Sequence, residues 1–127
     1  MFFCSRAPSI LVDVARRLSA GGLPLLLCPG PGEEAEARRD FPSAVVLEQV
    51  PLGAYAALMQ DAALVVANDT GPGHIAAAVG APLVSILGLT DAARWAPWGR
   101  RVQVLQQPGG WPALDAVLAA ARSALAA

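Results

Sequence analysis

The sequence contains no lysine, a single histidine and only two cysteines, and each shortage narrows the chemistry open to the chain. Without lysine, an anion-binding site has to use arginine side chains, backbone N–H groups or hydroxyls. Cys4 and Cys28 lack the spacing of a metal or redox site, so we interpret them as small buried hydrophobic residues. Because the sequence also shows no metal-ligand cluster, no P-loop and no catalytic triad order, we predict neither a metal site nor a cofactor.

Charge and long apolar runs are also scarce. Only 15% of the residues are charged and the formal net charge is −1, so the basic footprint of a nucleic-acid-binding protein is missing. No stretch reaches the roughly 18 apolar residues that a membrane-spanning helix needs. Residues 1–4 are apolar, but this run is too short for a signal peptide. We therefore expect a cytoplasmic protein.

Apolar runs of strand length alternate with helical patterns along the chain, and 55% of the residues are hydrophobic. Strands are expected at 23–28, 44–47, 63–67, 82–87 and 102–105, and helices at 9–20, 33–39, 52–61, just after residue 70, and at 114–125. Residues 88–99 are expected to form a long irregular loop. This order predicts an α/β fold, a Rossmann-like parallel sheet with helices on both faces, in one domain spanning 1–127. The chain begins with the helix or with a three-residue strand at 2–4, so the domain looks like part of a larger whole.

The polar residues of one distinctive stretch all lie in a turn between a buried strand and a short helix. Residues 66–82 read Val-Ala-Asn-Asp-Thr-Gly-Pro-Gly-His-Ile-Ala-Ala-Ala-Val-Gly-Ala-Pro. Gly71 is expected to take a backbone conformation that other residues avoid, and Pro72 suits the first position of a helix. A cap at Asp69 or Thr70 would leave free N–H groups at the carboxyl edge of the sheet, where helix N-termini bind phosphate. We predict an anion site here, with His74 facing the ligand.

A second turn, at residues 28–35, formally matches a dinucleotide-binding fingerprint. Gly30 and Gly32 follow a strand and open a helix, and Glu48 lies where a ribose-binding acid belongs. Pro31, however, removes a backbone donor, and the glutamates that follow put negative charge where a pyrophosphate would bind. Carboxylates at this edge suit ribose hydroxyls better than phosphate. A dinucleotide-binding Rossmann domain remains an alternative, which tighter binding of NAD than of ADP would favour.

A third edge loop follows the strand at 82–87 and carries Thr90 beside an aspartate. Taken alone, this loop is equally well explained as a turn with a helix cap. Arg100 and Arg101 are expected to be solvated, and the alternative is that either of them pairs with a phosphate. The tryptophans are expected to cover the core or a neighbouring domain rather than to stack on a base: Trp95, Trp98 and Trp111.

Together these turns resemble the signature of the ADP-heptose:lipopolysaccharide heptosyltransferases, glycosyltransferase family 9. There the run reads Asp-Ser/Thr-Gly-x-x-His-x-Ala-Ala-Ala-x-x-x-Pro, followed by a strand and Gly-Pro-Thr, which residues 69–82 and 88–90 match apart from Leu89. Residues 52–62 are similar to the family helix before this run, and residues 23–34 are similar to its strand, glycine turn and glutamate. The resemblance covers roughly residues 8–107.

This resemblance implies the GT-B fold, in which two Rossmann-like domains flank a catalytic cleft, and this chain would be most of the C-terminal, donor-binding domain. By position, Glu33, with Glu34 as the second choice, would hold the ribose of an ADP-heptose-like donor. Val50 would lie against the adenine, and Thr90 would line the cleft. The first turn would surround the diphosphate and the sugar, through Asp69, Thr70, Gly71, Gly73 and His74.

The chain also departs from the family pattern. The family's N-terminal domain, with the acceptor site and the catalytic base, has no counterpart here. The family's phosphate-binding lysine is absent or replaced by Arg6, and Gly73 stands where a larger residue is usual. With those parts missing, the resemblance assigns this chain no catalytic residue beyond a supporting role for His74.

We therefore expect the donor-binding domain of an inverting, metal-independent glycosyltransferase of lipopolysaccharide core synthesis. The core acceptor would bind only in a complete enzyme. The alternative is a truncated module that binds a nucleotide sugar and is inactive by itself. An uncovered domain face would be occupied by the N-terminal domain or by a second copy of the chain. A position peripheral to the inner membrane is compatible with the resemblance.

Overall fold

Six short parallel strands form the centre of the molecule. The computed structural model describes residues 2–3, 9–68, 71–88, 92–107 and 111–126. The strands are β1 (Phe2–Phe3), β2 (Leu26–Leu27), β3 (Val45–Val46), β4 (Val65–Ala67), β5 (Leu83–Ile86) and β6 (Val102–Leu105). Their order is β3-β2-β1-β4-β5-β6, and every neighbouring pair is parallel. From β1 to β3 successive strands are added toward one edge of the sheet, and from β4 to β6 they are added toward the other edge. The switch point between β1 and β4 is the place where such sheets bind ligands.

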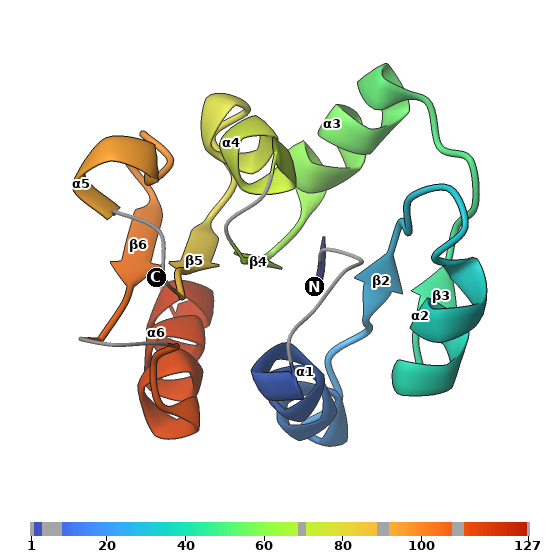
Figure 1. Ribbon diagram of the computed structural model, residues 1–127, viewed down its shortest axis with the longest axis horizontal. Helices are drawn as coiled ribbons and strands as arrows, with labels where there is room; N and C mark the ends of the chain where they lie inside the picture. Colours follow the sequence, from blue (N-terminus) through green and yellow to red (C-terminus); the bar gives the residue numbers. More distant parts are fainter. Residues whose placement is uncertain (1, 4–8, 69–70, 89–91, 108–110, 127) are drawn as a thin grey trace.

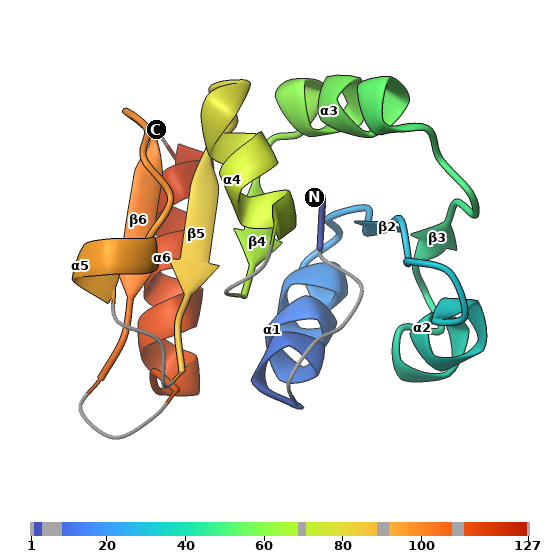
Figure 2. The same cartoon turned by 45° about the horizontal axis from the view of Figure 1, so that its top comes forward.

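Helices cover both faces of this sheet (Figures 1 and 2). They are α1 (Ser9–Ala20), α2 (Glu34–Asp40), α3 (Leu52–Asp61), α4 (Gly71–Ala78), α5 (Ala92–Trp95) and α6 (Leu114–Ala126). Helices α1, α2 and α6 share one hydrophobic core with the sheet, and α3 and α4 share a second core on the opposite face. The expected α/β fold with a parallel sheet between two helical layers is therefore confirmed.

Alternation along the strands divides the side chains between the two cores. On β4, Val66 belongs to the core beneath α1 and α6, whereas Val65 and Ala67 belong to the core beneath α3 and α4. All three side chains are fully buried. Burying a side chain as large as valine contributes about 1.5–3 kcal/mol, so the apolar strands that the composition indicated are the main stabilising element.

Glycine ends helix α4 in a defined cap. Gly80 has a φ of +79°, which side chains other than glycine rarely adopt. The N–H of Ala81 donates to the carbonyl of Ala76 at 3.0 Å, and the N–H of Gly80 donates to that of Ala77 at 3.2 Å. This Schellman arrangement satisfies carbonyls at the end of the helix and turns the chain into β5.

The structure corrects one local expectation and confirms another, the short strand at the start of the chain. The region predicted as an irregular loop, residues 88–99, contains the four-residue helix α5. The brief apolar segment at the start forms β1, and it pairs with both β2 and β4 at the middle of the sheet. Among the described residues, no helix has the length and apolar character needed to cross a membrane.

Candidate functional site

A hollow of about 710 Å³ opens at the carboxyl edge of the sheet, beside the switch point. Three chain segments build it: the turn after β2, the connection from β3 into α3, and the start of α4. Its size is typical of a small-molecule site. The lining residues are Cys28, Pro29, Gly30, Pro31, Gly32, Glu34, Gln49, Val50, Leu52, Tyr55 and Pro72.

The first wall is a tight turn between β2 and α2. The N–H of Glu33 donates to the carbonyl of Gly30 at 3.0 Å, and Gly32 has a φ of +82°. These features match a type II turn, which favours proline at the second position and glycine at the third, as Pro31 and Gly32 provide. The turn thus holds its residues in one conformation, and it exposes apolar proline surface to the hollow.

The two glutamates that follow this turn occupy different places. Glu34 lines the hollow, whereas Glu33 does not. The Glu33 carboxylate lies over the turn, 3.5 Å from where a β-carbon on Gly30 would stand. The structure thus brings the second choice for a ribose ligand, Glu34, to the hollow. Both acids precede or open helix α2, where the helix dipole favours negative charge.

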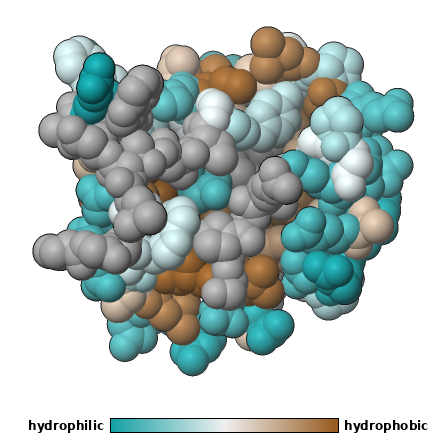
Figure 3. Space-filling view, in the orientation of Figure 1, coloured by the Kyte–Doolittle hydropathy of each residue, from teal (hydrophilic) through white to brown (hydrophobic). Residues whose placement is uncertain are grey.

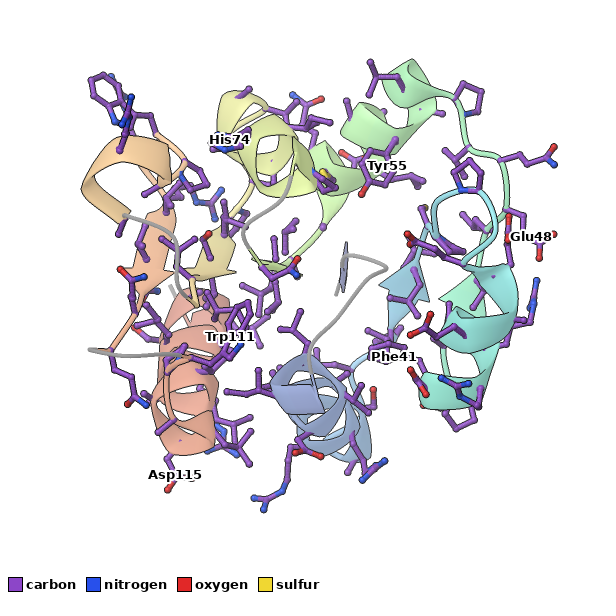
Figure 4. All side chains as sticks on the ribbon, in the orientation of Figure 1. Phe41, Glu48, Tyr55, His74, Trp111 and Asp115 are labelled. Carbon is purple, nitrogen blue, oxygen red and sulfur yellow. The ribbon has the colours of Figure 1, made fainter. Side chains whose placement is uncertain are left out.

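The second wall combines apolar side chains with a strained backbone residue. Val50, Leu52 and Tyr55 line the hollow from the β3–α3 connection and the first turn of α3, with Tyr55 labelled in Figure 4. Leu52 is 70% exposed, so an apolar group that enters here removes hydrophobic surface from water. Gln49 has a φ of +54°, which is uncommon outside glycine and marks backbone held in place by its surroundings.

The third wall is the start of α4, and here the structure separates residues that the sequence groups together. Pro72 lines the hollow, Gly73 is buried, and His74 is exposed and does not line it (Figure 4). Gly73 has Ala67 on one side and Pro97 on another, at 3.5 and 3.6 Å from the place of a β-carbon. Asp69, Thr70 and Thr90 lie outside the described residues.

The backbone conformation expected for Gly71 is wrong, whereas its place in the donor site stays a prediction. Gly71 is the first residue of α4, and its φ is not in the left-handed region, unlike those of Gly32 and Gly80. Among the described residues, and apart from its chain neighbours and the backbone of its own helix, no atom lies within 4 Å of the place where its β-carbon would stand. Neither the conformation nor the space at this position therefore requires glycine.

Cys28 is a free, buried thiol at the end of β2, on the floor of the hollow. Burial raises the pKa of this thiol above its ordinary value, because the thiolate is poorly solvated there. The prediction that Cys28 behaves as a small buried hydrophobic residue is confirmed. Among the described residues, no three His, Cys, Asp or Glu side chains lie together as a metal site.

Trp111 and Trp98 lie in different environments. Trp111 packs against Gly88 at the end of β5, so closely that a β-carbon on Gly88 would stand 2.8 Å from its ring. Gln106 holds the same place by donating from Nε2 to the carbonyl of Gly88 at 2.9 Å. Trp98, in contrast, is 93% exposed, so it does not cover the core of this domain, and its contact with a neighbouring domain stays a prediction.

The residues that suggested a dinucleotide fingerprint are engaged differently. Glu48, the proposed ribose ligand of that alternative, pairs with Arg38 at 3.0 Å on the outer side of α2. Pro31 and the acidic start of α2 leave the turn unfavourable for a pyrophosphate. Tyr55 and Leu52, which line the hollow, have no functional signal in the sequence, because both lie on an ordinary helical stripe.

The chain is similar to known proteins in both sequence and structure. The family model described as glycosyltransferase family 9 (heptosyltransferase) matches residues 12–116. Lipopolysaccharide heptosyltransferase 3 from Escherichia coli is 32% identical over 93 residues, covering 67% of this chain and 27% of the relative.

The solved structures agree. Escherichia coli heptosyltransferase WaaC with ADP superposes with a TM-score of 0.85 at 25% identity, over 97% of this chain and 43% of that one. The same enzyme with ADP-2-deoxy-2-fluoro heptose gives a TM-score of 0.72 at 28% identity, over 85% and 36%. A glycosyl transferase family 9 protein from Veillonella parvula gives 0.82 at 19% identity, over 99% and 46%.

These matches confirm the fold predicted from the resemblance, a Rossmann-like α/β domain similar to the C-terminal half of a GT-B glycosyltransferase. The chain spans less than half the length of each relative named here. Because the family model accounts for most of the sequence, from residue 12 to residue 116, the chain belongs to glycosyltransferase family 9, the heptosyltransferases.

Proposed function

We propose that this chain is the donor-binding domain of a heptosyltransferase of lipopolysaccharide core synthesis, and that it takes an ADP-heptose-like nucleotide sugar. The observation that carries the proposal is the hollow at the carboxyl edge of the sheet, which joins the turn after β2 to the start of α4. Two structural neighbours support it, because they were solved with ADP and with an ADP-sugar analogue.

The chemistry of the hollow suits the nucleoside part of such a donor. An adenine ring would displace water from the apolar surface of Val50, Leu52 and Tyr55. Glu34 is the acidic residue in the lining, and a carboxylate accepts hydrogen bonds from ribose hydroxyls. We assign the ribose to Glu34 before Glu33, because Glu33 lies over the turn and not in the hollow.

The diphosphate would lie at the N-terminus of α4, next to Pro72. There the free N–H groups of the first helical turn and the helix dipole favour an anion. Asp69, Thr70, Gly71, Gly73 and His74 belong to this part of the proposal, with Thr90 on the neighbouring loop. A base from the rest of a complete enzyme would take the acceptor proton. The acceptor oxygen would then form a bond to the anomeric carbon of the sugar, while the bond from that carbon to the diphosphate oxygen of ADP breaks. Helix α4 would stabilise the negative charge on the diphosphate of the leaving ADP.

Calorimetry with ADP and an ADP-sugar tests the binding site. We expect Glu34→Gln to weaken binding about tenfold or more, because a charge-assisted hydrogen bond is lost. Glu36→Gln is the matched control, since Glu36 is exposed on the same helix and does not line the hollow. Glu33→Gln decides between the two glutamates.

Three results would contradict this assignment. The first is no binding at millimolar ADP. The second is binding unchanged by Glu34→Gln, Asp69→Ala and His74→Ala alike. The third is tighter binding of NAD or NADP than of ADP, which would favour the dinucleotide alternative. Glycosyl transfer by this chain alone would exclude the alternative of an inactive module.

We also place the protein in the cytoplasm, peripheral to the inner membrane, where a complete enzyme would encounter a lipid-linked core acceptor.

A further inference from the structure

The connection from α5 to β6 presents one tryptophan to solvent. Trp98 is 93% exposed, and Arg100 and Arg101 next to it are exposed as well. Arg94, on α5, is a third exposed guanidinium in the same region. Figure 3 shows a few hydrophilic side chains at this corner of the molecule, near α5 and the start of β6.

The backbone on each side of Trp98 is fixed, so the indole is held outward. Pro97 is buried, and it lies 3.6 Å from the place of a β-carbon on Gly73. Gly99 is pressed against Val102 and Ala77, because a β-carbon there would stand 2.9 Å from Cγ2 of Val102 and 3.3 Å from the carbonyl oxygen of Ala77. The β-ladder then anchors Arg101, whose carbonyl accepts a hydrogen bond from the N–H of Leu83 at 2.9 Å.

Arginine is the only charged residue type between residues 92 and 114, and Asp91 directly precedes this segment. No acidic residue occurs from residue 92 to residue 114, and among the described residues neither Arg100 nor Arg101 has an ion-pair partner. The nearest acid along the chain after this segment, Asp115, lies at the far end of α6 in Figure 4. Acidic residues are also distributed unevenly along the chain. Residues 1–69 contain eight acidic residues and five arginines, whereas residues 70–127 contain two acidic residues and four arginines.

We propose that Trp98, Arg100 and Arg101 form a docking surface for an anionic lipid bilayer. Tryptophan favours the interface between headgroups and acyl chains, and arginines near an anionic leaflet add attraction that salt screens. A protein partner would require a larger apolar centre than a single indole. The net charge of −1 and the two arginines are too little for a nucleic-acid site.

Flotation of the 127-residue chain with vesicles tests this surface, using phosphatidylcholine alone and with about 30% phosphatidylglycerol. We expect binding to the anionic vesicles that salt weakens. Arg100→Gln with Arg101→Gln should lower the partition coefficient roughly 25-fold, at about fivefold for each arginine. The matched control is Arg16→Gln with Arg17→Gln on α1, which removes the same charge from exposed positions elsewhere and should have little effect.

Tryptophan fluorescence tests whether the indole itself enters the bilayer, because the emission wavelength depends on the polarity around the ring and not on the charge of the protein. Vesicles should shift the tryptophan emission to shorter wavelength, and Trp98→Phe should abolish that shift. Trp98→Ala should weaken partitioning roughly tenfold and leave ADP binding unchanged, because Trp98 does not line the hollow. Loss of lipid binding and loss of donor binding are therefore distinguishable.

Several outcomes would overturn the docking surface. If the α1 control and the Arg100/Arg101 double variant lost vesicle partitioning to the same extent, binding would depend on net charge and not on this surface. No partitioning at low salt, or an emission shift that persists in Trp98→Phe, would remove the surface as the contact. Self-association that Trp98→Ala abolishes, without vesicle binding, would identify a protein interface in its place.

Discussion

The turn after β2 and the turn after β4 look alike in the sequence, since each follows a buried strand and carries Gly-Pro-Gly, but glycine serves different purposes in them. In the first turn, Gly32 has a φ of +82° and its surroundings are open. In the second, Gly71 and Gly73 lie within a helix without positive φ, and Gly73 is buried between Ala67 and Pro97. Conformation therefore requires glycine at the first position, whereas the last position accepts alanine but is too closely packed for a larger side chain. Substitutions at the three positions should separate these two requirements.

The largest effect is expected where space is short. Gly73→Leu would place γ and δ carbons among atoms that already lie 3.5–3.7 Å from the β-carbon position, so we expect a loss of about 1–3 kcal/mol in the free energy of unfolding. Urea denaturation measures it. Gly73→Ala is the control: its β-carbon makes ordinary contacts, and alanine favours the helix, so stability should stay within about 1 kcal/mol of the parent. A Leu variant as stable as the Ala variant would refute crowding at this position.

A smaller loss is expected where conformation decides. Gly32→Ala should destabilise the protein by about 1–2 kcal/mol, because a β-carbon is disfavoured at this φ even though no atom crowds it. Gly32→Asn should lose less, since asparagine tolerates the left-handed region better. The measurement is thermal or urea unfolding of the three proteins. Equal stability of the glycine and alanine proteins would mean that the turn relaxes at no cost.

The smallest effect is expected at Gly71, where neither requirement applies. Gly71→Ala should change the free energy of unfolding by less than about 1 kcal/mol, in the stabilising direction if it changes at all, because alanine is the better helix former. Calorimetric unfolding resolves the sign. A loss as large as that of Gly32→Ala would restore the original expectation that this position needs a special backbone conformation.

Much of the fold could be predicted because its signals are local. Leu11, Val14 and Leu18 mark one face of α1, and two glycines end it, so the predicted 9–20 agrees with the structure. Strand β6 agrees equally well, at 102–105. Helix α5 could not be predicted, because four residues are too few to show a helical period. The central place of β1 depends on pairing with distant strands, which no local pattern encodes.

The candidate site was predictable in outline and not in detail. The family resemblance assigned both edge turns to one donor site, and the hollow indeed joins Gly30 and Gly32 to Pro72. Which of two adjacent glutamates enters the hollow depends on side-chain direction, and the spacing did not settle it. Tyr55 and Leu52 resemble core residues until the tertiary fold brings them to the hollow. The roles of Asp69, Thr70 and Thr90 stay predictions.

The buried thiol on the floor of the hollow has a chemical consequence of its own. At neutral pH its raised pKa keeps Cys28 mostly protonated, and the protonated form reacts slowly with electrophiles and oxidants. A ligand that fills the hollow would shield the sulfur further, so Cys28 would react only in protein molecules whose hollow is empty. The rate at which an alkylating reagent labels Cys28 would then report how much of the protein carries a ligand, and the protein would need no added label.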